Sequence, residues 1–252
     1  MSEGGKELLI QRVRLIKELL IILLILCSSG CIIKESTYKF GELSLLAEDK
    51  TDKGPRFHNF TELYEHIFFP MKNASIKICE IGIANGGSLI LWQEYFPNAT
   101  IFGIDIIDRH FLNSKRIKTF IADQANRDQL KQFIEKCGSD YTIMLDDGGH
   151  AMEQQQTSFG YLFKYVKPGG YYIIEDVHTS LPRFYRGYGV VTNGKNSTLR
   201  MINQYIKTGK IESQYLTPDE SKYLTKNIEY CNLFFRKGRN RPSITCIFKK
   251  RK

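Results

Sequence analysis

Apolar residues occur along the chain in short runs that alternate with segments of helical spacing. Such runs, about six residues long and bounded by turn residues, are typical of strands buried on both faces of a parallel sheet. Because helix-like segments separate the runs, the pattern predicts an α/β fold in which helices cover a parallel sheet. The predicted strands are residues 76–84, 100–106, 117–123, 141–147 and 171–176.

The C-terminal part of the chain shows a different pattern. Residues 229–237 and 243–250 are strand-like and are joined by a turn with glycine and proline, which predicts a terminal hairpin. The sequence VKPGG at 166–170 predicts a helix end and a turn. Residues 178–197 are rich in aromatic residues and glycine but lack periodicity, which indicates a long functional loop. No boundary requires a second domain, so we expect a single domain over residues 38–252.

Residues 1–37 differ from the rest because they contain an apolar segment, 19–33, behind a basic flank. At about 1.5 Å per residue, a helix over that segment would be roughly 22 Å long, shorter than the roughly 30 Å hydrocarbon core of a membrane. Three interpretations remain open. They are a signal peptide or anchor, an amphipathic helix that contacts a membrane surface or docks elsewhere through residues 6–33, and a start-site artefact or core helix.

Composition and charge narrow the functional classes. The 252 residues carry a net charge of +9, but residues 236–252 alone hold eight basic residues and no acidic one. This tail predicts a solvated basic hairpin, or contact with an anionic glycan, membrane surface or nucleic acid. Because the basic residues cluster in the tail, we expect no nucleic-acid substrate. Six cysteines without CxxC spacing predict reduced thiols and a cytoplasmic catalytic domain, although the N-terminal segment leaves a lumenal or secreted location open.

Acidic residues follow nearly every predicted strand, where open α/β sheets bind their ligands. In the first turn, EIGIANGGSL, Gly82 and Gly86 let the backbone approach a ligand, although the spacing is not the GxGxxG of a dinucleotide site. Asp105 follows Gly82 by 23 residues, near the roughly 20-residue offset of an acid that binds ribose hydroxyls. These features predict an adenosine-type cofactor. Asp123 could accept a hydrogen bond from the adenine amino group or cap the next helix.

Three carboxylates end the fourth and fifth predicted strands: Asp147, Glu175 and Asp176. Neighbouring parallel strands bring them to one edge of the sheet, where like charges repel unless a cation binds. Hard oxygen ligands select Mg²⁺, Mn²⁺ or Ca²⁺ over zinc. The sequence therefore predicts a divalent metal site.

A histidine lies beside this predicted metal site. His150 follows Asp147 by three residues across two glycines and is suited to accept a proton from an alcohol whose ionisation a metal ion assists. The alternative is that Asp146 caps the following helix and His150 is an ordinary turn residue.

Six stretches in order along residues 51–180 resemble one known family: TDKGPRFHNFTELYEHIF, EIGIANGGSL, FPNATIFGIDI, FIADQ, LDDGGH and IEDVHTS. The chain resembles class I S-adenosylmethionine-dependent methyltransferases of the metal-dependent sugar O-methyltransferase group. That group includes macrolide-sugar and rhamnosyl O-methyltransferases and cephalosporin hydroxylase-like relatives. The resemblance implies a Rossmann-like, seven-stranded, mostly parallel sheet with an antiparallel last strand and helices on both faces.

The resemblance also implies roles for individual residues. Mg²⁺ or Mn²⁺ would bind Asp147, Glu175 and Asp176, and His150 would be the catalytic base. For S-adenosylmethionine, it implies that Glu80 and the turn with Gly82 and Gly86 hold the methionine part, Asp105 the ribose, and Asp123 with Gln124 the adenine. Lys53 and His58 would belong to a segment that folds over the cofactor or acceptor, and His178 and Thr179 would contact the substrate.

The function that these features favour is methyl transfer from S-adenosylmethionine to a hydroxyl of a sugar-bearing acceptor. Acceptor specificity is expected in residues 181–210, and a homo-oligomer is compatible with the sequence. Two alternatives remain: an NAD-dependent oxidoreductase of related fold, and a non-catalytic, membrane-anchored glycan-binding module.

Overall fold

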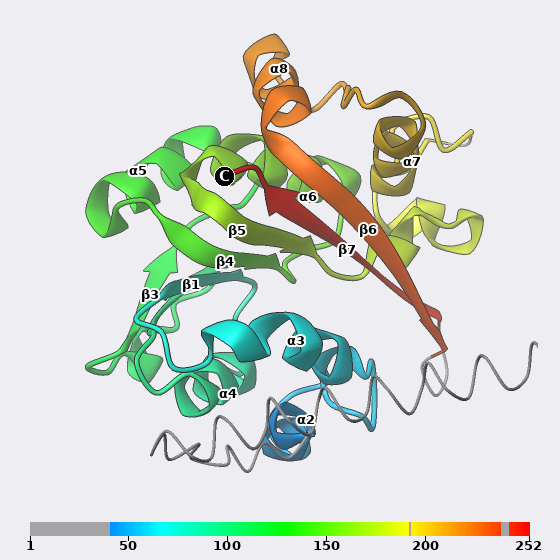
Figure 1. Cartoon of the computed structure of the whole chain (residues 1–252). Helices are drawn as coiled ribbons and strands as arrows, with labels where there is room; N and C mark the ends of the chain where they lie inside the picture. The colour runs from blue at the N-terminus through cyan, green and yellow to red at the C-terminus, as the bar shows by residue number, and fades with distance from the viewer. Residues whose placement is uncertain (1–40, 192, 238–241) are drawn as a thin grey trace, which may run out of the picture. The chain divides into compact units, whose positions relative to one another are not determined.

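A sheet of seven strands forms the centre of the computed structural model, which describes residues 41–191, 193–237 and 242–252 (Figure 1). The strand order is β3-β2-β1-β4-β5-β7-β6; the pairs among β1 to β5 are parallel, and β7 is antiparallel to both neighbours. The strands are β1 (Lys77–Ile81), β2 (Thr100–Asp105), β3 (Ile117–Ile121), β4 (Tyr141–Asp146), β5 (Val166–Ile174), β6 (Ile228–Lys237) and β7 (Pro242–Lys250). This topology confirms the predicted fold and the terminal hairpin.

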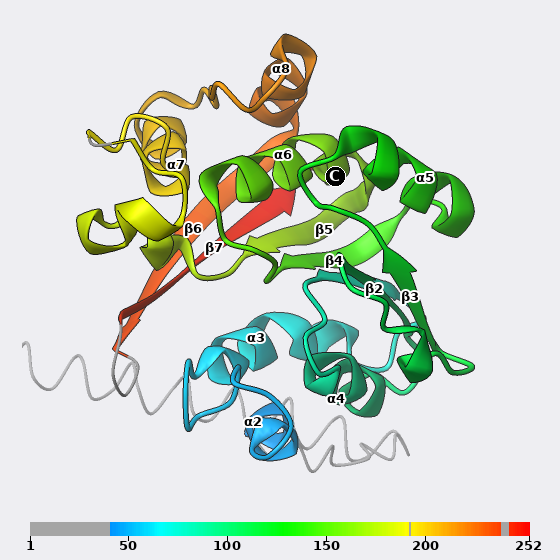
Figure 2. The same ribbon diagram turned by 180° about the vertical axis from the view of Figure 1, so that it is seen from behind.

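Helices cover both faces of the sheet (Figure 2). One face carries α2 (Glu42–Ala47), α3 (Phe60–Phe68) and α4 (Gly87–Tyr95), and the other carries α5 (Arg127–Cys137), α6 (Met152–Leu162), α7 (Thr198–Thr208) and α8 (Pro218–Asn227). Short 3₁₀ helices are η1 (Phe69–Met71), η2 (His110–Leu112), η3 (Phe163–Tyr165), η4 (Val177–Ser180) and η5 (Pro182–Gly187).

An aromatic cluster packs α3 and α4 against the sheet. Leu63, Tyr64 and Phe68 recur at the spacing of one helical face and are buried. Trp92 of α4 is buried against this face, with ring centroids 6.2 Å from Tyr64 and 6.0 Å from Phe68. Its indole N–H donates to Glu80 Oε2 at 2.6 Å, so the packing of these helices also fixes a carboxylate of β1.

The register of the strands aligns their carboxyl ends. Ile81, which ends β1, pairs with Ile104 of β2 and with Asp146 of β4. Asp146 pairs in turn with Ile174, the last residue of β5. The residues that follow these four strands therefore meet at one edge of the sheet.

Two local predictions differ from the structure. The VKPGG segment lies inside β5 rather than in a turn before it, because Val166 already pairs with Tyr141 of β4 and a register shift before Ile143 accommodates the Pro-Gly-Gly sequence. Residues 178–197 were predicted as an irregular loop, but they include most of η4 and all of η5.

The predicted leader or anchor at residues 1–37, and with it the membrane contact through residues 6–33, lies outside the described residues. Among the residues that are described, no helix has the length and apolar character needed to cross a membrane. The residues from Gly41 to Lys252 belong to one compact unit, and the start of the predicted domain at residue 38 falls just outside them.

Candidate active site

A cleft of about 630 Å³ opens at the carboxyl ends of β1, β2 and β4. Its wall contains predicted cofactor, metal and base residues from separate parts of the chain: Gly82, Asp105, Asp123, Gln124, Asp147, His150 and Asp176. A cleft of this size at the strand ends is where an α/β sheet binds a nucleotide-like ligand.

The glycine-rich turn after β1 borders this cleft. Gly82 has φ 85°, and a Cβ there would lie 2.1 Å from the carbonyl oxygen of Asp147, so only glycine allows the turns after β1 and β4 to pass so closely. Gly86, at φ 84°, precedes the first residue of α4. Asp105 Oδ2 accepts hydrogen bonds from the N–H groups of Ile83 at 2.9 Å and Ala84 at 3.2 Å. Asp105 thus braces the turn while it lines the cleft.

Asp123 and Gln124, which follow β3, also line the cleft. The alternative that Asp123 caps the next helix is wrong, because Asn126 is the N-cap of α5 and accepts from the N–H groups of residues 128 and 129. Gln124 is buried, donates to Asp146 Oδ1 at 3.0 Å and accepts from the Gly149 N–H at 2.8 Å. It therefore ties the β3 end of the cleft to the β4 turn.

Asp146 is part of the scaffold beneath the cleft. It is fully buried and accepts hydrogen bonds from Gln124 and from the Ser158 hydroxyl. Burial raises its pKa to about 6, although these hydrogen bonds oppose the shift. The prediction that Asp146 caps the following helix is wrong, since Ala151 is the N-cap residue of α6.

The turn DDGGH brings the side chain of His150 close to that of Asp147. A Cβ on Gly148 would lie 1.8 Å from Gln124 Oε1, so a side chain there would displace the amide oxygen that accepts from the Gly149 N–H. His150 itself has φ 57°, an unusual value for a non-glycine residue. The Thr179 hydroxyl donates to the His150 carbonyl at 3.1 Å and fixes this conformation.

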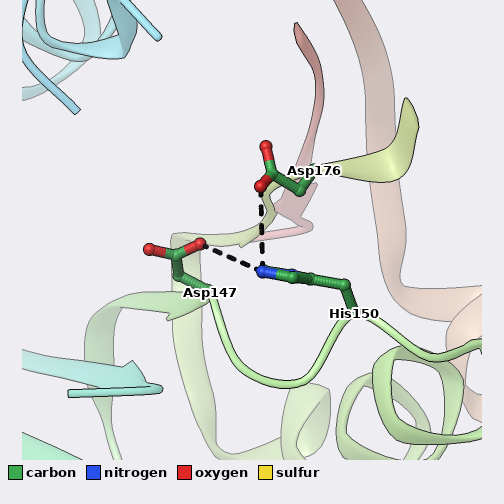
Figure 3. A group of neighbouring side chains, drawn as sticks. All are labelled: Asp147, His150 and Asp176. Carbon is green, nitrogen blue, oxygen red and sulfur yellow. Dashed lines mark ion pairs between the residues drawn. The ribbon is translucent and has the colours of Figure 1, made fainter. Parts of the chain in front are cut away.

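Asp147, His150 and Asp176 form a cluster that can hold a metal ion (Figure 3). Each offers a ligand atom, and these atoms lie within 4.8 Å of one another. His150 Nε2 is 3.9 Å from Asp147 Oδ1 and 3.7 Å from Asp176 Oδ2. Asp176 Oδ1 and His150 Nδ1 are buried and have no hydrogen-bond partner among the described residues. The carboxylates of Asp147 and Asp176 supply the oxygen ligands that a hard divalent ion prefers.

Glu175, the third predicted metal ligand, faces the protein interior instead. It is 1% exposed and accepts from the Tyr64 hydroxyl at 2.5 Å and from Lys53 Nζ at 2.8 Å. Burial and the neighbouring charge of Asp147 raise the pKa of Glu175 well above its usual value. The structure therefore groups Asp147 and Asp176 with His150, while Glu175 belongs to a second, buried network.

Lys53 is the centre of that network. Its side chain is 1% exposed, and Nζ contacts Asp147 Oδ2 and Glu175 and lies 3.3 Å from Glu80 Oε1. Burial opposes the charge of the ammonium group, but these carboxylates outweigh it and raise the pKa of Lys53 well above its ordinary value. Lys53 and His150 lower the pKa of Asp147 against the effect of burial.

Neither Lys53 nor Glu80 forms part of the cleft wall, although both were predicted to bind the cofactor. Sequence reasoning missed that Lys53 neutralises the buried acids and that Tyr64 holds Glu175. The available signal was the number of strand-end acids, since closely buried carboxylates require a buried cation.

The three residues predicted to meet substrate surround Asp176 or His150. His58 Nδ1 is 3.8 Å, and His178 Nδ1 3.5 Å, from Asp176 Oδ1. His178 is buried against Phe184, and burial lowers its pKa. Thr179 is buried beneath His150. These residues contact the cluster but do not line the cleft.

No protein-family model matches the chain. Among curated proteins, it is 37% identical over 166 residues to the 8-demethyl-8-(2-methoxy-alpha-L-rhamnosyl)-tetracenomycin-C 3'-O-methyltransferase of Streptomyces olivaceus. That match covers 63% of this chain and 42% of that protein. It is 32% identical over 204 residues to the mycinamicin VI 2''-O-methyltransferase of Micromonospora griseorubida. That match covers 74% of this chain and 50% of that protein. The chain thus spans about half the length of the curated relatives it matches.

A solved structure also relates the chain to methyltransferases. The MycE methyltransferase from the mycinamycin biosynthetic pathway, in complex with Mg and SAH, superposes with a TM-score of 0.70 at 26% identity, over 85% of this chain and 56% of that one. The strand order, the cleft at the strand ends and this likeness define a class I S-adenosylmethionine-dependent methyltransferase fold. Within that class, the homologues of the chain are sugar O-methyltransferases, which confirms the resemblance seen in the sequence.

Proposed function

We propose that the protein transfers a methyl group from S-adenosylmethionine to a hydroxyl of a sugar on a glycosylated acceptor. The observation that carries this proposal is the cluster of Asp147, His150 and Asp176 on the wall of a nucleotide-sized cleft, in a fold shared with sugar O-methyltransferases.

We propose one direction for the cofactor in the cleft. The adenosine part would lie between Asp105 on one side and Asp123 with Gln124 on the other, since these residues line the end of the cleft built by β2 and β3. The sulfonium and its methyl group would then point toward Asp147 and His150. Glu80 would act indirectly, because it contacts Lys53 and Trp92 and is not part of the cleft wall.

The residues present fit a Mg²⁺ or Mn²⁺ ion. Asp147 and Asp176 would hold it, and Glu175 could join them only in competition with Lys53 or Tyr64. Once bound, the ion would orient the acceptor's hydroxyl groups and lower the cost of removing a proton from one of them. The two carboxylates of the cluster supply the oxygen ligands that such an ion prefers.

His150 is proposed to accept the proton of the attacking hydroxyl. Its Nε2 lies near Asp147 and Asp176, the two carboxylates that would hold the ion. As the sugar oxygen bonds to the methyl carbon, the carbon–sulfur bond breaks, its electron pair remains on sulfur and S-adenosylhomocysteine is released. Because a sulfonium methyl group is already activated, alignment of oxygen, carbon and sulfur is expected to contribute more than proton removal.

The acceptor's remaining contacts are proposed to come from residues 181–210, which follow the metal cluster through η4 and include η5 and α7. The relatives act on sugars of tetracenomycin and mycinamicin, which makes glycosylated polyketides the first acceptors to test. Membrane contact through residues 6–33, a cytoplasmic location and a homo-oligomer remain predictions.

A methylation assay tests this function. The full-length protein, methyl-labelled S-adenosylmethionine and Mg²⁺ are incubated with a panel of glycosylated polyketides, and products are identified by mass spectrometry. We expect label on a sugar hydroxyl, and a loss of about 10²- to 10⁴-fold in rate for His150→Gln, which removes the base. Label on amines or nucleic acid, with none on any sugar, would contradict the proposal.

A further inference from the structure

We propose that Lys53 is a built-in cation that competes with the divalent metal ion for the carboxylates of the active site. This inference rests on the metal site in the proposed function. It goes beyond that function because it assigns Lys53 neither to the cofactor nor to the acceptor, but to control of metal affinity.

The carboxylate of Asp147 is shared between two cation positions. Its Oδ2 contacts Nζ of Lys53, while its Oδ1 faces His150 Nε2 at 3.9 Å, beside Asp176. One side of Asp147 thus serves a buried ammonium group and the other serves the cluster in the cleft. A metal ion in that cluster would lie one carboxylate away from a positive charge.

Lys53 also withholds Glu175. Nζ donates to Glu175 Oε2 at 2.8 Å, and the Tyr64 hydroxyl donates to Oε1 at 2.5 Å, so both oxygens of Glu175 are engaged. This explains why Asp176 lines the cleft although the adjacent Glu175 does not. A metal ion that recruits Glu175 must compete with the ammonium group or with the Tyr64 hydroxyl for one of these oxygens.

The backbone around Lys53 holds this cation in place. The Lys53 carbonyl accepts hydrogen bonds from the N–H groups of Phe60 at 2.8 Å and Thr61 at 3.2 Å, in the first turn of α3. Tyr64 belongs to the same helix, so α3 fixes both groups that bind Glu175. The backbone of Lys53 is therefore anchored, which keeps its ammonium group within reach of the carboxylates.

The physical consequence has two opposite parts. A positive charge in contact with a metal ligand repels a divalent ion, and burial makes this repulsion strong and insensitive to salt. The same charge neutralises Asp147, Glu175 and Glu80 in the metal-free protein, where unpaired buried carboxylates would be costly. Removal of the charge should therefore tighten metal binding and destabilise the metal-free protein.

Calorimetric titration of the full-length chain with MgCl₂ or MnCl₂ tests this competition. We expect Lys53→Met to bind the metal about tenfold or more tightly than the wild type, and to show a larger metal-induced rise in Tm. The control is Lys72→Met, because Lys72 is partly buried and pairs with a carboxylate, Glu42, away from the cleft. The control should bind metal as the wild type does.

A charge-balanced pair covers the case in which Lys53→Met fails to fold. Lys53→Met/Glu80→Gln removes one charge of each sign and leaves the cleft wall unchanged, and its reference is Glu80→Gln alone. Tighter metal binding by the double variant than by its reference supports the competition. Equal or weaker binding, in either background, overturns it. If neither the wild type nor any variant binds Mg²⁺ or Mn²⁺, the metal site of the proposed function fails as well.

Discussion

Two adjacent aspartates have opposite environments at the end of β4. Asp146 is turned into the protein, where burial raises its pKa to about 6, while Asp147 is turned toward Lys53 and His150, which lower its pKa. Successive side chains of a strand point to opposite faces, which accounts for the difference. Asp146 is therefore a structural group, and Asp147 is the one available to a metal ion.

This assignment predicts a pH-dependent contribution of Asp146 to stability. The folded protein keeps the Asp146 proton up to about pH 6, whereas the unfolded chain releases it near pH 3.9. A raised carboxyl pKa favours folding below this window, and that stabilisation is lost as the pH rises through it. The free energy of unfolding of the wild type, minus that of Asp146→Asn, should fall by about 2 kcal/mol between pH 4 and pH 7. Urea unfolding at several pH values measures it, and a difference that stays constant would contradict the burial argument.

At the scale of elements, the site depends on turns that pack closely after neighbouring strands. The turn after β1 passes so near the turn after β4 that Gly82 has no room for a side chain, and Asp105 accepts two of its N–H groups. The cleft is thus shaped by contacts between turns as much as by the strands.

Gly82→Ala should accordingly destabilise the protein and impair cofactor binding. Its Cβ would lie 2.1 Å from a backbone oxygen and its φ is 85°, so strain and a clash combine to an expected loss of about 3 kcal/mol or more. Chemical denaturation and S-adenosylhomocysteine titration measure both effects. Gly187→Ala is the control, because Gly187 has open space around it and no positive φ. Equal stability of the two variants would disprove the close approach.

Some elements could be predicted from sequence and others could not. The strands from β1 to β4 stand out because each is an apolar run that ends at a polar turn. The start of β5 was missed because VKPGG has the residues of a turn, and only its pairing with Tyr141 makes it part of a strand. Local sequence does not encode such non-local pairing.

At the scale of the whole molecule, the sheet brings residues far apart in sequence to one edge. That Asp147, His150 and Asp176 meet there followed from the strand ends. The orientation of Glu175 did not, because it depends on Lys53 and Tyr64, which lie 122 and 111 residues away. Sequence patterns predict which residues reach the site, and side-chain packing decides which of them face the cleft.

Calorimetric titration of the chain with S-adenosylhomocysteine, beside a parallel titration with NAD, tests the methyltransferase assignment. We expect that S-adenosylhomocysteine binds, that NAD does not, and that Asp105→Asn weakens binding by about tenfold because Asp105 lines the cleft at the proposed ribose position. Asp108→Asn, an exposed carboxylate off the cleft wall, should leave the affinity unchanged. Binding of NAD without binding of S-adenosylhomocysteine would contradict the methyltransferase assignment.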